Sequence, residues 1–88
     1  MAEAAQIRRE RLTAEIRRII SRKVAHGRVP ACCTLPELME AAERSELRPD
    51  RDEALAAMRS MHRRDGYRCA ININRIPMVL LHQPDIKE

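Results

Sequence analysis

Arginine and serine side chains at helical spacing form the most suggestive chemical pattern in the sequence. In the segment RPDRDEALAAMRSMHRR (48–64), Arg59 and Arg63 are four residues apart, with Ser60 beside them and Ala56 one turn earlier. Residues four apart share one face of a helix, and an arginine can donate two parallel hydrogen bonds to guanine. Because alanine is small, it would let the helix approach a DNA groove closely. The pattern therefore predicts contact with duplex DNA.

An ordinary surface helix with good caps would carry similar charges. Two capping boxes, Thr34 with Glu37 and Asp50 with Glu53, predict where two helices begin. Acidic residues in a first turn and arginines in a last turn complement the helix dipole. The segment 34–65 holds six basic and eight acidic residues, which weakens its long-range attraction to DNA. A solvated helix and a DNA-reading helix both stay open.

The spacing of apolar residues predicts three helices that position these side chains. The first begins somewhere in 5–12 and runs to about His26, with Gly27 as its stop. The second spans 34–44 and the third spans 50–65. The residues expected to face the core from these helices and the turn between them are Leu12, Ile16, Ile19, Ile20, Val24, Leu35, Leu38, Met39, Ala42, Leu47, Ala54, Leu55, Met58 and Met61.

After Gly66 the apolar residues alternate, which predicts a β-hairpin. Cys69, Ile71 and Ile73 are expected to face the core, and NRIP (74–77) is expected to form the turn before the return strand. The register we expect pairs Ile73 with Met78, Ile71 with Leu80, and Cys69 with His82.

Two further segments bear on assembly. RVPACC (28–33) contains Pro30 and predicts either a connector or a brief edge strand. The return strand 78–82 is apolar on both faces, so we expect the first helix, a second subunit or a partner to cover its second face. A homodimer through this strand or through the first helix is the interpretation we favour.

The order of these elements resembles the winged helix-turn-helix superfamily over roughly residues 10–83. The fold implied is α+β and mostly helical, with three helices followed by a β-hairpin wing. The resemblance gives one domain at 11–83, an arm or helix extension at 1–10, and a tail at 84–88. It implies that the third helix reads the major groove while the wing contacts the adjacent backbone.

A transcriptional regulator bound to double-stranded DNA is thus the expected function. The alternative is a protein-interaction module without enzymatic activity, such as an adaptor or a phage-type inhibitor, because many members use this fold for protein contacts. Base contacts are expected near the third helix, and phosphate contacts at the hairpin and the first helix. The DNA-binding residues we expect are Arg59, Ser60, Arg63, Ala56, Arg75, Arg68, Arg18 and Arg22.

Composition disfavours several other classes. The 88 residues carry a net charge of +4 and contain no Phe or Trp, so they offer little surface for stacking single-stranded bases. We expect no enzyme, cofactor or metal site, because only two glycines are present and Cys32 and Cys33 are adjacent rather than spaced as zinc ligands. Without an apolar run of membrane-spanning length or a signal-peptide region, we expect a cytoplasmic protein.

Overall fold

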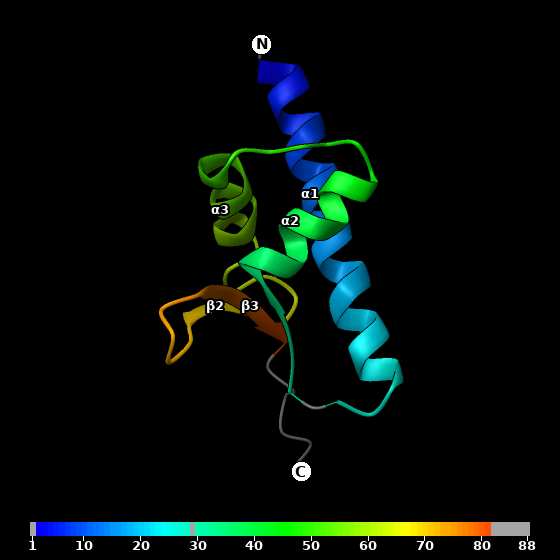
Figure 1. Ribbon diagram of the computed structural model, residues 1–88, viewed down its shortest axis with the longest axis vertical. Helices are drawn as coiled ribbons and strands as arrows, with labels where there is room; N and C mark the ends of the chain where they lie inside the picture. Colours follow the sequence, from blue (N-terminus) through cyan, green and yellow to red (C-terminus); the bar gives the residue numbers. More distant parts are fainter. Residues whose placement is uncertain (1, 29, 82–88) are drawn as a thin grey trace.

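The computed structural model describes residues 2–28 and 30–81, which form three helices and one three-stranded antiparallel sheet (Figure 1). The α+β, mostly helical prediction is confirmed, but a third strand lies between the first two helices. That strand begins in the segment 28–33, which the sequence left open as a connector or an edge strand, and ends at Thr34. The elements are α1 (Ala2–Ala25), β1 (Ala31–Thr34), α2 (Leu35–Arg44), α3 (Arg51–Ser60), β2 (Tyr67–Ile71) and β3 (Pro77–Leu81).

Helix α1 is a single continuous helix that includes residues 2–10. Of its predicted apolar stripe, Leu12, Ile16 and Ile20 are fully inaccessible to solvent, whereas Ile19 and Val24 are partly buried against the core. The helix ends at Ala25, and Gly27 then adopts a φ of +82°, a left-handed conformation that glycine reaches without a side-chain clash. The tail predicted at 84–88 lies outside the described residues.

The predicted capping box of α2 is confirmed. The Thr34 hydroxyl accepts a hydrogen bond from the Glu37 N–H, and the Glu37 carboxylate accepts one from the Thr34 N–H at 2.9 Å. The Glu37 carboxylate also accepts a hydrogen bond from the Lys23 ammonium at 2.7 Å. The same ammonium donates a second hydrogen bond to the Cys32 carbonyl. One local cap thus also fastens α1 to the start of α2.

Helix α3 is shorter than predicted, because it ends at Ser60 and not near Asp65. Its N-terminal cap is as expected, with the Asp50 carboxylate accepting from the Glu53 N–H at 2.8 Å. Glu53 does not complete a box with Asp50, since its carboxylate instead accepts from Arg8. The position of the C-terminal end was therefore predicted wrongly, while that of the start was predicted correctly.

The early end of α3 is followed directly by a tight reversal of the chain. The chain reverses through residues 61–66, where Arg63, Asp65 and Gly66 all have positive φ. This turn is closed by two backbone hydrogen bonds, from the Arg63 N–H to the Tyr67 carbonyl and from the Tyr67 N–H to the Arg64 carbonyl, each 2.8 Å long. The reversal brings the Tyr67 side chain into the core, where it is 9% exposed.

The hairpin register differs from the prediction by three residues. Ile71 pairs with Pro77 and Cys69 with Val79, so the predicted pairs Ile71–Leu80, Cys69–His82 and Ile73–Met78 are wrong. An odd shift turns a strand over, and Val79 consequently faces the core with no exposed surface. Ile73 lies beyond β2 and is 95% exposed.

The loop between β2 and β3 explains this register. The Asn72 side-chain oxygen accepts from the backbone N–H groups of Asn74 and Ile76, at 2.8 and 3.0 Å. The Asn72 N–H in turn donates to the Ile76 carbonyl. The turn therefore spans 72–76 instead of 74–77, and Pro77 belongs to β3.

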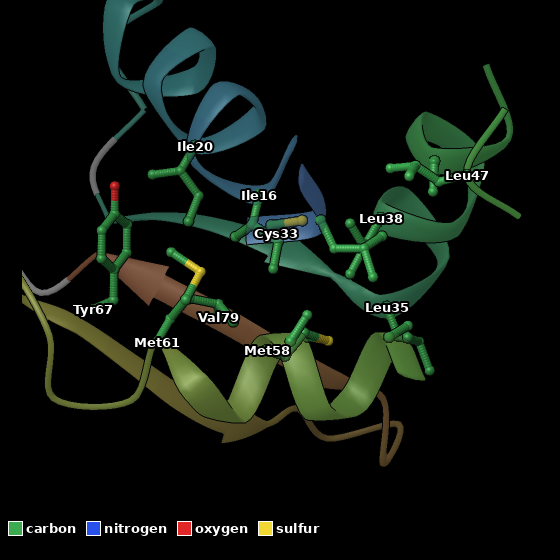
Figure 2. Packing of buried hydrophobic residues seen from close by; sticks show 14 of the residues in the cluster. Ile16, Ile20, Cys33, Leu35, Leu38, Leu47, Met58, Met61, Tyr67 and Val79 are labelled. Carbon is green, nitrogen blue, oxygen red and sulfur yellow. The ribbon is translucent and has the colours of Figure 1, made fainter. Parts of the chain in front are cut away.

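The core lies between α1, the sheet and the two shorter helices. The sheet order is β1–β3–β2, so β3 is the central strand and pairs on both sides. Figure 2 shows Ile16 and Ile20 from α1 directed toward Val79 and Met61, with Cys33 among them. The aliphatic and sulfur-containing side chains fill the interior that aromatic residues occupy in many domains.

Candidate nucleic-acid interface

Helix α3 and the 72–76 loop lie on the same flank of the molecule, away from most of α1 (Figure 1). Arg59, in the last turn of α3, is exposed and lines a groove between α3 and the hairpin. The groove encloses about 370 Å³. We call it the α3–hairpin groove, and its lining residues are Leu55, Met58, Arg59, Cys69, Ala70, Ile71, Pro77 and Met78.

Arg59 and Ser60, both predicted to contact DNA, point to two different sides of α3. Ser60 is half-buried, its hydroxyl donates to the Ala57 carbonyl at 2.7 Å, and it faces α1. Ala56, also half-buried, precedes Ser60 by one turn. The helix surface available to a ligand therefore lies between Arg59 on the hairpin side and Ser60 on the α1 side.

Arg63 does not share a helix face with Arg59. It lies beyond the end of α3, with a φ of +63° and with its backbone N–H bonded to the Tyr67 carbonyl. Arg63 is exposed to solvent, so its guanidinium remains accessible at this turn. The helical spacing that suggested the pair is therefore not realised.

Arg75 and Arg68, the two hairpin arginines predicted to contact DNA, lie on separate parts of the hairpin surface. Arg75 lies in the 72–76 loop, exposed, with a φ of +62° and its N–H bonded to the Asn72 carbonyl at 2.8 Å. Arg68 is an exposed residue of β2 that pairs with Leu80. Because strand neighbours alternate and Tyr67 is buried, the Arg68 side chain leaves the sheet on the face opposite the core.

Arg18 and Arg22 are not brought together with the α3 and hairpin arginines. Both line a depression between α1 and α2, where acidic side chains offset the basic ones. Arg18 approaches the Glu15 carboxylate at 3.4 Å. Glu15 is 8% exposed and also accepts a hydrogen bond from the Ser45 hydroxyl at 2.8 Å.

Sequence reasoning missed a second group of arginines between α1 and α3. Arg9, Arg17 and Arg64 line a groove of about 570 Å³ together with Ser60. We call this the α1–α3 groove. One signal was available, because Arg9 falls on the apolar arc of the first helix. Its position is explained by α1 extending past the core, where this arc borders the groove and not the interior.

Burial shifts the pKa of two of the cysteine thiols. Burial raises the pKa of the Cys33 thiol to about 12, and burial also raises the pKa of Cys69 despite the nearby Arg59. Over residues 2–28 and 30–81, no three His, Cys, Asp or Glu side chains are grouped as metal ligands. In the same segments, no helix is long and apolar enough to cross a membrane.

Comparisons of this chain with protein-family models, with curated proteins and with solved structures gave no match. The proposed function therefore rests on the structure of this chain alone.

Proposed function

We propose that this chain is a small winged-helix protein that binds duplex DNA and regulates transcription. In this proposal α3 enters the major groove and the 72–76 loop contacts the neighbouring backbone. The element order, with one strand after α1 and a hairpin after α3, supports the winged-helix assignment. The observation that carries the proposal is that α3 bears the exposed Arg59 and lies between a hairpin whose 72–76 loop bears the exposed Arg75 and a groove lined by three arginines.

The exposed arginines suggest a division of roles. Arg59 projects from α3 itself, so it is the residue we assign to base edges, where a bidentate contact discriminates bases by roughly 1–3 kcal/mol. Arg75 lies in a loop held by Asn72, which suits a phosphate contact that carries no sequence information. Arg63 and Arg68 are exposed beside these two elements and would add backbone contacts.

The first test is a titration of the protein against random-sequence duplex DNA at several salt concentrations. Each phosphate contact releases counterions, so log K should fall with log salt by about 0.9 per contact. A protein that uses three to five arginines should give a slope of roughly −3 to −4.5. No binding at low salt would contradict the proposal.

The α3–hairpin groove favours a second candidate, a protein-interaction module. Among the described residues that line this groove, Arg59 alone is charged, and Ile71 at its edge is 69% exposed. Ile73, which follows β2, is 95% exposed. Replacing both isoleucines by lysine separates the candidates, because added positive charge strengthens DNA binding but disrupts an apolar docking surface.

Self-association is a separate part of the proposal. Since β3 is the central strand, a homodimer would use its second face, where Met78 and Leu80 are half-buried, or the exposed start of α1 around Ile7. Light scattering at high protein concentration should then give twice the chain mass. A mass equal to that of one chain would contradict the proposed homodimer.

A further inference from the structure

We propose that the α1–α3 groove binds backbone phosphates of duplex DNA and extends the interface beyond α3 and the 72–76 loop. This inference rests on the proposed function and assigns a phosphate-binding role to Arg9, Arg17 and Arg64. These arginines come from two segments far apart in the sequence, and the packing of α1 beside α3 brings them to one groove.

The charges of the α1–α3 groove are less neutralised than those of the α1–α2 depression. In the depression, three basic residues each pair with a carboxylate, as Arg18–Glu15, Lys23–Glu37 and Arg44–Glu40. In the α1–α3 groove, Arg17 approaches Asp65 at 3.6 Å. Within residues 2–28 and 30–81, neither Arg9 nor Arg64 forms an ion pair.

The ion pair between Arg17 and Asp65 at the groove is weak enough for a phosphate to take the place of the Asp65 carboxylate. Its two side chains are 47% and 75% exposed, so water and salt screen the attraction between Arg17 and Asp65. Besides Asp65, Glu10 is the one acidic side chain at the groove among the residues that the structure describes, against three arginines. The groove therefore keeps a positive excess that a polyanion can meet.

Apart from Gln6, whose side-chain amide also lines the groove, the polar neighbours leave the arginines as the donors. The Thr13 hydroxyl donates to the Glu10 carbonyl at 2.9 Å, and the Ser60 hydroxyl donates to the Ala57 carbonyl at 2.7 Å. Both hydroxyl hydrogens are thus engaged within their own helices. Because a guanidinium has five N–H donors and fits the geometry of a phosphate, the three arginines supply the binding chemistry.

The walls of the groove are held in place before any ligand arrives. Arg8, next to Arg9, donates to the Glu53 carboxylate at 2.6 and 2.9 Å and to the Leu47 carbonyl at 2.7 Å. These bonds fix the first half of α1 against the start of α3. A preformed groove lowers the ordering cost of binding, and Arg9 and Arg17, about 12 Å apart along the helix axis, can then reach separate phosphates.

The experiment compares two double variants that remove the same charge from different grooves. Arg9→Ala with Arg64→Ala removes two arginines of the α1–α3 groove, while Arg18→Ala with Arg22→Ala removes two from the α1–α2 depression. Each protein is titrated against a fluorescent random-sequence duplex at four salt concentrations, with circular dichroism as the check on folding. Arg9→Lys with Arg64→Lys keeps the charge and serves as the rescue.

The inference predicts that the first pair flattens the salt slope by about 1.8, which is two phosphate contacts, and weakens binding at least tenfold at low salt. The Arg18 and Arg22 pair should change the slope by less than half of that amount, and the lysine pair should restore it. An equal loss in both alanine pairs would mean that only net charge matters and would overturn the inference. If the wild-type protein binds DNA and the Arg9 and Arg64 pair leaves its slope unchanged, the inference fails while the proposed function stands. If the wild-type protein does not bind, both fail.

Discussion

Arg8 and Glu53, which are 45 residues apart in the sequence, form a two-pronged ion pair between α1 and α3. The guanidinium donates to both carboxylate oxygens, at 2.6 and 2.9 Å, and also to the Leu47 carbonyl. Because α3 carries the proposed DNA contacts, this pair connects the start of the long helix to the interface. Its loss should affect both stability and the geometry of the α1–α3 groove.

Arg8→Ala should lower the stability of the protein, and Arg8→Lys should not restore it, because an ammonium cannot supply the same planar pair of donors. The hydrogen bond from Arg8 holds the pKa of Glu53 below its usual value of about 4.3. A carboxylate with a lowered pKa stabilises the fold above its unfolded-state pKa, and this contribution disappears as pH falls through the folded-state pKa.

Urea denaturation at pH 7 and at pH 2.5 measures this effect. The wild-type protein should be more stable than Arg8→Ala at pH 7, and the difference should shrink at pH 2.5, because falling pH shifts Glu53 toward its protonated form. Arg18→Ala is the matched control, since it also removes one arginine of α1 but breaks no contact with α3. A difference that persists unchanged at pH 2.5 would contradict the assigned role of the ion pair.

The hairpin register predicts unequal effects at adjacent positions of β3. Val79 is fully buried and Met78 is half-buried on the opposite face, so Val79→Ala should cost about 1.5–2 kcal/mol and Val79→Asp should prevent folding. Met78→Asp should leave the chain folded. Thermal unfolding followed by circular dichroism checks the three variants. The register is wrong if Met78→Asp unfolds the protein while Val79→Asp does not.

The helix caps and the hairpin register show which features of the fold could be predicted from the sequence and which could not. The caps at Thr34 and Asp50 were predictable because a cap involves residues only three apart. The apolar stripe of α1 was predictable for the same local reason. The register was not, since it depends on which backbone groups Asn72 binds in the folded loop.

The candidate site was predictable only residue by residue. Arg59 and Arg75 were identified as exposed arginines, and they are exposed. The packing of α3 between α1 and the hairpin places Ser60 and Arg59 on different sides of the helix, and the departure of Arg63 from the helix follows from the turn at 61–66, which precedes the buried Tyr67. The α1–α3 groove escaped prediction because it needs the packing of two helices that no local pattern specifies.

The two adjacent cysteines should differ in reactivity. Burial raises the pKa of Cys33 to about 12, so this thiol remains protonated and poorly nucleophilic at pH 8. Cys32 is half-buried and should react first with iodoacetamide in the native protein. Tandem mass spectrometry can locate the modification on either residue. Preferential labelling of Cys33 would show that β1 is oriented differently from the structure.

Variants of Arg59 and Arg75 should distinguish recognition of the DNA sequence from sequence-independent binding to the DNA backbone. Arg59→Ala should reduce the preference for one DNA sequence over another by roughly 1–3 kcal/mol, because it removes a base contact. Arg75→Ala should weaken all sequences alike and flatten the salt slope by about 0.9. Binding to a selected and a random duplex, compared by anisotropy, distinguishes the two. Identical behaviour of both variants would contradict the division of roles.

The most direct measurement of the central claim is a ¹H–¹⁵N chemical-shift titration of the protein with duplex DNA at low salt. The account predicts that the largest shifts cluster on α3 and the 72–76 loop, around Arg59 and Arg75. Glu40 and Glu43, on the acidic exposed surface of α2, should change little. Shifts centred on α2, or no shifts at all, would contradict the account.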